Sequence, residues 1–315
     1  MQNVSDIYDV IIIGGGPAGL TAGLYTSRAR LKSLLIEKGF AGGLVTTIDW
    51  VENYPGFDEG ISGVELSQRM ERQAKKFGLE TVQGSVKEIY VHDEIKRIVL
   101  EEGNVYESKT VILATGANPG LLKVEGEEKY RGRGVSYCAT CDGAFFRGKK
   151  IAVVGGGNSA VQEALFLTKL AEVVYIVHRR DQLRATKIIQ ERAFANSSIK
   201  FIWNSLVEKI EGDDTVHALF LKNVKTGEVS RLEVEGVFIY VGYNPSTGFL
   251  KGIVKLDEDN YILTDEDMST SVPGIFAAGD VRAKPLKQIT TAVGDGATAA
   301  VSSEKYISQM NQMKR

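Results

Sequence analysis

The sequence predicts an α/β protein built from two similar units, each containing a parallel sheet. A run of β-branched residues, a glycine-rich turn and an apolar helix follow one another twice, beginning at Val10 and at Ile151. Each repeat is followed by a second short apolar run, and such runs are typical of parallel strands buried on both faces. The length of 315 residues independently favours about two domains.

The composition is that of an ordinary globular protein. It is 43% hydrophobic and 25% charged, which excludes disordered and fibrous classes. A formal net charge of −2 offers no basic footprint, so we expect no nucleic-acid partner. The apolar runs at 10–13 and 173–177 are too short to cross a bilayer. Residues 1–9 carry two acidic and no basic residues, unlike a secretory signal. We therefore expect a soluble, cytoplasmic protein that does not bind membranes.

The first glycine-rich turn has the pattern G-x-G-x-x-G, formed by Gly14, Gly16 and Gly19, with Pro17 and Ala18 between the last two. It lies directly after the strand expected at 10–13 and before a helix expected at 20–30. In this context the three glycines allow a tight turn, the approach of a pyrophosphate and close helix–strand packing. The turn therefore predicts dinucleotide binding.

An acidic residue follows at the position that such a site requires. Glu37 ends the next expected strand, at 33–36, and comes 18 residues after Gly19. A carboxylate at this place accepts hydrogen bonds from a ribose diol. The alternative without a ligand is an ordinary strand–helix turn with a surface glutamate. The spacing between Gly19 and Glu37 favours instead a bound dinucleotide with a free ribose hydroxyl.

The second glycine-rich turn has the related pattern G-x-G-x-x-A. Its members are Gly155, Gly157 and Ala160, with Asn158 and Ser159 between the last two. It again separates a strand, expected at 151–154, from a helix. This turn predicts a second dinucleotide site.

The residues after the next strand, expected at 173–177, are basic instead of acidic: His178, Arg179 and Arg180, with Arg184 close behind. Guanidinium groups bind a 2′-phosphate through charge-assisted hydrogen bonds, whereas a carboxylate would repel it. The cluster therefore predicts NADP(H) at the second site. The alternative is a solvated basic face with Asp181 as its partner.

Both cysteines of the chain lie in one C-x-x-C segment, at Cys138 and Cys141, followed by Asp142. A structural zinc site would need four protein ligands, but no other cysteine exists and the three histidines are dispersed. Two buried structural thiols are a second alternative. A redox dithiol is favoured, because C-x-x-C spacing commonly lowers one thiol pKa. Asp142 is then either the acid/base for thiol–disulfide exchange or a helix-capping or turn residue.

Two further apolar segments end in turn residues. The strand expected at 111–113 ends in Ala114, Thr115 and Gly116, and the segment 274–278 ends in Gly279 and Asp280. No low-complexity linker separates the units. The turn residues at 118–120 and 243–247 are therefore the expected joints.

Taken together, these motifs closely resemble the low-molecular-weight thioredoxin reductases across essentially the full chain. The position of the C-x-x-C pair just before the second glycine turn is particular to that family. The resemblance implies two Rossmann-like dinucleotide-binding domains, with the NADPH domain, expected at 119–245, inserted in a discontinuous FAD domain at 1–118 and 246–315. It also implies a homodimer that reduces thioredoxin, and rotation of one domain against the other about the two joints.

The resemblance further implies roles for individual residues. NADPH would reduce FAD, and the flavin would reduce the Cys138–Cys141 disulfide. Cys141 would lie nearest the flavin with Asp142 as its acid/base, and Cys138 would attack the disulfide of thioredoxin. Besides the glycine-turn and basic residues named above, the expected cofactor-binding residues are Glu37, Lys38, Gly42, Gly43, Leu44, Asn53, Ala114, Thr115, Gly116, Gly279, Asp280, Lys287, Gln288 and Ile289.

Three positions depart from the usual family pattern. Leu44 stands where family members usually carry glutamine, and Lys287 and Ile289 stand in place of arginine and alanine. We expect these changes to affect the fine tuning of the flavin and not the reaction class. The alternatives are a reductase of the same fold with another acceptor, one with NADH or ferredoxin as donor, and a non-enzymatic redox sensor.

Overall fold

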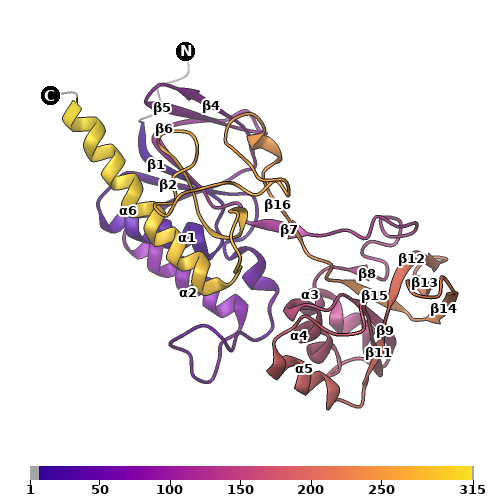
Figure 1. Ribbon diagram of the computed structural model, residues 1–315. Coiled ribbons are helices and arrows are strands. Elements are labelled where there is room, and N and C mark those ends of the chain that lie inside the picture. Colours follow the sequence, from indigo (N-terminus) through magenta and orange to yellow (C-terminus); the bar gives the residue numbers. More distant parts are fainter. Residues whose placement is uncertain (1–6, 314–315) are drawn as a thin grey trace. The chain divides into compact units, whose positions relative to one another are not determined.

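The computed structural model describes residues 7–313, and the chain divides into two compact units (Figure 1). Unit 1 comprises residues up to 118 together with those from 244 onwards, and unit 2 comprises 119–243. Residues 1–6, which hold most of the segment compared above with a secretory signal, lie outside the described residues. Among residues 7–313, no helix combines the length and apolar character needed to span a membrane.

The sheet of unit 1 has the order β3-β2-β1-β6-β5-β4, and β17 also pairs with β6. The pairs among β1, β2, β3, β6 and β17 are parallel, whereas β4, β5 and β6 pair antiparallel. The strands are β1 (Tyr8–Ile13), β2 (Ser33–Glu37), β3 (Glu80–Gln83), β4 (Val86–His92), β5 (Ile95–Leu100), β6 (Val105–Leu113) and β17 (Ile275–Ala277).

The long strand β6 joins two parts of unit 1 that are far apart in the sequence. Its first half pairs with β5, and its second half pairs with β17 in the register Val111↔Ile275 and Leu113↔Ala277. The C-terminal part of the chain therefore completes the sheet that the N-terminal part begins.

Three helices of unit 1 contribute to one hydrophobic layer. They are α1 (Pro17–Arg28), α2 (Gly63–Lys76) and α6 (Ile289–Met313), and α1 contacts both others (Figure 1). Leu20 of α1 and Ala299 of α6 share a core with Val10 and Ile12 of β1. The first helix begins at Pro17, three residues before the expected start, because proline is well suited to the first helical position. The short helices are η1 (Gly43–Thr47), η3 (Gly248–Leu250) and η4 (Gly279–Val281).

Unit 2 contains a fully parallel sheet with the order β11-β10-β9-β15-β8 and a separate antiparallel sheet, β12-β13-β14. The strands are β8 (Val135–Ser136), β9 (Lys150–Val154), β10 (Val173–Val177), β11 (Ile199–Ile202), β12 (Ser205–Gly212), β13 (Val216–Asn223), β14 (Val229–Glu233) and β15 (Gly236–Ile239). The helices are α3 (Ala139–Asp142), η2 (Gly143–Phe146), α4 (Asn158–Leu167) and α5 (Lys187–Phe194).

The two faces of the parallel sheet in unit 2 carry different layers. Val153 of β9 and Ile176 of β10 share a core with Ala160 and Val161 of α4. On the other face, Val154 of β9 packs with residues of β12 and β13. The parallel sheets of both units, each with a strand–turn–helix–strand start, confirm the predicted fold class.

The chain passes between the units twice, at 118–119 and at 243–244. Both crossings lie within short strands, β7 (Ala117–Pro119) and β16 (Tyr243–Pro245), which pair with each other. These are the segments in which the turn chemistry led us to expect the joints.

Unit 1 also buries a lysine that has no role in the expected chemistry. Lys96 of β5 is fully buried, with its ammonium 5.4 Å from the centre of the Tyr306 ring on α6. Nζ donates to the carbonyl of Glu94 at 3.4 Å, a long hydrogen bond. Burial lowers the pKa of Lys96, because removal from water disfavours the charged form.

We predict that Lys96→Met raises the apparent melting temperature near neutral pH, because a buried charge is replaced by an apolar chain of similar size. The lowered pKa means that the unfolded chain binds this proton more tightly than the folded one. The destabilisation by Lys96 therefore fades as pH rises from the folded pKa towards the unfolded one. Thermal unfolding between pH 7 and 10 should show that the difference in melting temperature between Lys96→Met and the unsubstituted protein becomes smaller as pH rises. The exposed control Lys87→Met should show no such trend.

Candidate functional site

Unit 1 contains a cavity of about 290 Å³ built around the first glycine turn. Its walls come from the β1–α1 turn, the end of β2, the end of β6, η1, the 278–280 segment and the start of α6. A neighbouring cavity of about 270 Å³ shares Gly14, Glu37 and Thr115 with it and extends past Gly84 and Phe249. The two together form an elongated site suited to a ligand with two separated ends.

The glycine turn has the close approaches that the sequence pattern predicts. A Cβ on Gly19 would lie 1.8 Å from the carbonyl oxygen of Gly14, and a Cβ on Gly14 would lie 2.4 Å from that of Ala114. Gly14 also has a φ of +105°, in the region that favours glycine. Gly16, in contrast, has no atom within 4 Å of a Cβ position and lines the cavity. The turn is therefore tight within the protein and open on the ligand side.

The start of α1 faces this cavity through Gly16 and Pro17. Gly16 is the N-cap residue and provides no side-chain hydrogen bond, so the first amides of α1 have no cap from it. A helix N-terminus carries a partial positive charge and binds phosphate. The geometry fits a pyrophosphate at this end.

Glu37 lies at the end of β2 in the walls of both cavities. Its Oε2 accepts a hydrogen bond of 2.6 Å from the amide of Gly15, and Oε1 accepts one of 2.9 Å from Gly39. These two bonds hold the carboxylate at the place where the sequence analysis expects a ribose acceptor.

Asp280 is a second carboxylate of the cavity wall. Within the described residues its Oδ1 is buried without a hydrogen-bond partner, and the nearest ammonium, Lys284 Nζ, is 3.6 Å away. Burial raises the pKa of Asp280, and the charge of Lys284 opposes that rise. A buried acceptor with no donor is costly, so this oxygen is suited to a hydroxyl group supplied by a bound ligand.

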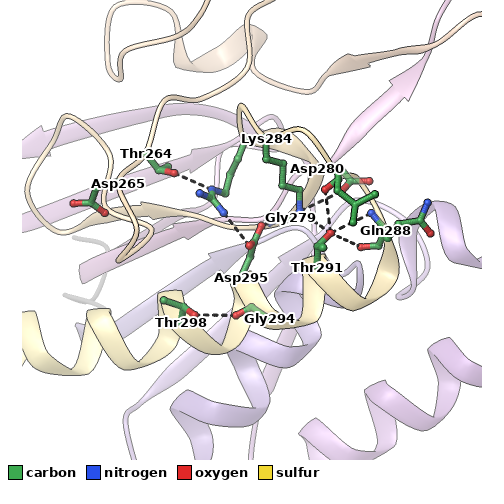
Figure 2. A network of polar contacts seen from close by, with 12 residues as sticks. Thr264, Asp265, Gly279, Asp280, Lys284, Gln288, Thr291, Gly294, Asp295 and Thr298 are labelled. Carbon is green, nitrogen blue, oxygen red and sulfur yellow. Dashed lines mark hydrogen bonds and ion pairs between the residues drawn. The ribbon is translucent and has the colours of Figure 1, made fainter. Parts of the chain in front are cut away.

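A network of ion pairs fixes the segment that carries Asp280 (Figure 2). Asp295 of α6 accepts from Lys284 at 2.9 Å and from Arg282 at 2.8 Å, and its Oδ2 also accepts from the amide of Gly279 at 3.0 Å. The three charged side chains are nearly buried, so solvent screens them little. The network joins η4 to α6 beside the cavity.

Most residues expected at the FAD site line the first cavity. The set that does so comprises Gly14, Gly16, Pro17, Ala18, Glu37, Lys38, Gly43, Leu44, Ala114, Thr115, Gly116, Gly279, Asp280, Gln288 and Ile289. Gly19, Gly42, Asn53 and Lys287 are not among the lining residues. Asn53 instead donates to Gln288 at 3.0 Å, and the Lys287 ammonium lies 3.9 Å from the centre of the Tyr261 ring.

The sequence analysis missed several residues of this site. Asn118 and Ser246 line both cavities and are joined by a hydrogen bond of 3.0 Å. Both lie in segments that were interpreted only as joints. Their turn chemistry was visible in the sequence, but nothing local indicated that the two segments meet at a cavity.

The second glycine turn, in unit 2, repeats the tight geometry of the first. A Cβ on Gly155 would lie 2.4 Å from the carbonyl oxygen of Tyr240 and 2.8 Å from the Cβ of Ala160, whereas Gly157 is open. Gly157 precedes α4 as its N-cap, without a side-chain hydrogen bond. Asn158 accepts from the amide of Thr186 at 2.7 Å, which ties the start of α4 to the basic segment.

The basic cluster divides into one buried and three exposed side chains. Arg179, Arg180 and Arg184 are exposed and make no ion pair within the described part of the chain. Asp181, the partner considered above, binds Lys225 at 3.0 Å instead. The three guanidinium groups are therefore available to an anionic ligand.

His178 lies beneath the glycine turn and is not exposed like the arginines. It is 4% exposed, and a Cβ on Gly156 would come within 2.5 Å of its ring. Burial, followed by the charges of the arginines, lowers the pKa of His178. The ring packs against the glycine turn at Gly156.

The two cysteines form a disulfide at the start of α3, with their Cα atoms 5.3 Å apart. Cys141 is exposed and Cys138 is half-buried. No group of three potential metal ligands occurs among residues 7–313, and the sulfurs bind each other. The disulfide agrees with the redox interpretation and not with a zinc half-site or two structural thiols.

Asp142 faces the strand that precedes the cysteines. It stands at the N-cap of η2 but makes no capping hydrogen bond there. Its Oδ2 accepts a hydrogen bond of 2.7 Å from Ser136 at the end of β8. The helix-capping alternative for Asp142 is therefore not what the structure shows.

Comparison with known proteins assigns the family. The model of the pyridine nucleotide-disulphide oxidoreductases matches residues 8–296. This chain belongs to that family. Thioredoxin reductases from Listeria innocua and Bacillus subtilis are each 50% identical to this oxidoreductase, over 313 and 307 residues. The alignments cover 99% and 97% of this chain and 98% and 96% of those proteins.

A solved structure is equally similar. The crystal structure of Lactococcus lactis thioredoxin reductase matches this oxidoreductase with a TM-score of 0.94 and 50% identity. The match covers 96% of this chain and 99% of that one. The elongated cavity, the open helix N-terminus and the buried Asp280 oxygen without a hydrogen bond fit the flavin dinucleotide that the sequence analysis expects.

We predict that Asp280→Ala weakens the binding of FAD by about tenfold or more, because a hydrogen bond to a charged group contributes about 1.5–3 kcal/mol. The dissociation constant of FAD for the apoprotein, measured by the quenching of flavin fluorescence, tests this. Asp265→Ala is the control, since this exposed carboxylate lies outside both cavities. Equal affinities for the Asp280→Ala variant and the control would contradict the assignment.

Proposed function

We propose that this oxidoreductase is an NADPH-dependent thioredoxin reductase that transfers electrons through FAD and the Cys138–Cys141 disulfide to thioredoxin. The observation that carries the proposal is the disulfide itself, which lies in the same unit as a second dinucleotide turn. The similarity to thioredoxin reductases over nearly the whole chain supports the same assignment.

Unit 1 is the FAD domain in this proposal. The open turn at Gly16 and the N-terminus of α1 hold the pyrophosphate, Glu37 holds the adenosine ribose, and Asp280 holds a hydroxyl of the ribityl chain. Bound there, FAD supplies a two-electron carrier between a nicotinamide and a disulfide. Lys284 pairs with both Asp280 and Asp295, and this network holds Asp280 in place.

Unit 2 is the NADPH domain. Gly157 and the start of α4 receive the pyrophosphate, and Arg179, Arg180 and Arg184 receive the 2′-phosphate. NADH lacks that phosphate, so the exposed guanidinium groups favour NADPH over NADH as the donor.

The dithiol passes electrons to thioredoxin by two exchange steps. The Cys138 thiolate attacks the disulfide of thioredoxin, forms a mixed disulfide and releases one thioredoxin thiolate. The Cys141 thiolate then attacks the Cys138 sulfur, which restores the Cys138–Cys141 disulfide and releases the second thiolate. Asp142 takes the proton of the Cys141 thiol and gives it to a leaving thiolate, and solvent supplies the other proton.

The proposal extends to the assembly and the cellular setting. We propose a cytoplasmic homodimer without a membrane partner, as the sequence analysis expects. The unit boundaries at the two joints support an NADPH domain inserted in the FAD domain. Rotation about β7 and β16 would present the dithiol in turn to the flavin and to thioredoxin.

We predict that Cys141→Ser retains the yellow colour of bound flavin and abolishes the NADPH-dependent reduction of thioredoxin. One thiol of the pair is then missing, so the mixed disulfide cannot be resolved. Ala144→Ser, at an exposed position of the same segment, should keep the wild-type rate. Continued turnover in Cys141→Ser would remove the dithiol from the mechanism.

We predict that Arg179→Ala combined with Arg180→Ala raises the KM for NADPH by about tenfold or more and leaves the KM for NADH unchanged. Each lost arginine–phosphate contact is worth about 1.5–3 kcal/mol, and NADH makes no such contact. Steady-state kinetics with both donors measure the ratio of the KM for NADPH to the KM for NADH. The exposed control Arg147→Ala should leave this KM ratio unaltered. An unaltered KM ratio in the double variant would exclude 2′-phosphate binding at this cluster.

A further inference from the structure

Ser136 connects the two chemical parts of the dithiol segment. It is the last residue of β8, is 4% exposed, and lies two residues before Cys138 and six before Asp142. Its hydroxyl donates to Asp142 Oδ2 at 2.7 Å and accepts from the amide of Cys138 at 3.1 Å. A single oxygen thus binds both the acid/base residue and the backbone of the attacking cysteine.

The direction of these hydrogen bonds is determined by the donors available. The Ser136 hydroxyl has one hydrogen and two possible acceptors, Asp142 Oδ2 at 2.7 Å and the Cys138 carbonyl at 3.2 Å. The carboxylate oxygen is the nearer of the two acceptors. Oδ2 is therefore engaged by Ser136, while Oδ1 has no hydrogen-bond partner within the described part of the chain and can exchange a proton.

The backbone around Ser136 is held rigidly. Ser136 pairs with Phe238 of β15, in the parallel sheet. The residue that follows β15, Tyr240, accepts a hydrogen bond of 2.9 Å from the amide of Ala139, the first residue of α3. Two neighbouring strand ends thus fix the dithiol turn, Tyr240 through its side-chain hydroxyl, which accepts from the Ala139 amide, and Ser136 through Asp142.

From this geometry we propose that Ser136 is the positioning residue for Asp142 in thiol–disulfide exchange. Its hydrogen bond to Oδ2 holds the carboxylate in one orientation. Oδ1 is then always the oxygen directed to the exchanging thiol, and the two oxygens do not exchange places. This inference rests on the proposed function, since it deepens the role of Asp142 within the same site. Ser136 itself gains and loses no proton in the reaction.

A double-mutant cycle separates positioning from a merely structural role. We predict that Ser136→Ala slows the single-turnover reduction of thioredoxin disulfide by the NADPH-reduced enzyme about tenfold or more, the loss expected for a hydrogen bond to a charged group. In the Asp142→Ala background, the same change should alter the rate by less than about twofold, because the group it acts through is gone. Additive effects in the cycle would overturn the proposal.

Two controls keep these outcomes interpretable. Reduction of the bound flavin by NADPH should be unaffected in Ser136→Ala, and this result would show that the variant is folded. If Ser136→Ala does not fold, Ser136→Gly removes the same hydroxyl and is measured instead. Ser205→Ala is the matched control, since Ser205 is also buried in unit 2 but donates only to the Trp203 carbonyl, at 2.9 Å. It should keep the wild-type exchange rate. A wild-type enzyme that fails to reduce thioredoxin would refute the proposed function, whereas an active enzyme with an additive cycle would refute the role of Ser136 alone.

Discussion

The close approach of α1 to the ends of β1 and β6 is the constraint on which the rest of unit 1 depends. A Cβ at Gly19 would lie 1.8 Å from the Gly14 carbonyl oxygen, and one at Gly14 would lie 2.4 Å from the Ala114 carbonyl oxygen. Only glycine fits at both positions, so the first turn of α1 starts directly at the sheet edge. The partial positive charge of the helix then faces the cavity, and Glu37 and Asp280 can be placed around it.

Unit 2 has the same close packing of a glycine turn against the strand ends, and it also carries the Cys138–Cys141 disulfide. Gly155 lies against Tyr240 and Ala160, which brings the start of α4 to the carboxyl edge of the parallel sheet. The dithiol segment begins at that edge too, because β8 ends at Ser136. The carboxyl ends of parallel strands are where ligands bind in open α/β folds. One sheet edge therefore carries both the donor site and the redox pair.

Local patterns in the sequence sufficed for the elements whose cause is local. The strands at Val10 and Ile151, both glycine turns and the C-x-x-C pair follow from residues within a few positions of one another. The predicted strand at 111–113 is the last third of a longer strand, β6. The first part of β6 was missed because residues 105–108, which pair with β5, lack a continuous apolar run. The helix α1 starts three residues earlier than expected, because Pro17 is well suited to the first helical position.

Long-range contacts were not predictable in the same way. Lys284, Arg282 and Asp295 are ordinary charged residues in the sequence, and they become a buried network only when η4 packs on α6. His178 reads as one more base beside Arg179, but the close packing of Gly156 places its ring inside unit 2. The bond between Ser136 and Asp142 depends on how α3 turns back towards β8.

An anaerobic absorbance titration tests the central claim most directly. The purified protein is treated stepwise with NADPH and then with thioredoxin disulfide, while the visible flavin bands are followed. The account predicts a yellow protein that NADPH bleaches and that thioredoxin disulfide restores, with two thiols of thioredoxin formed for each NADPH consumed. A protein that stays colourless after incubation with FAD, or a bleached flavin that thioredoxin disulfide leaves reduced, would contradict it.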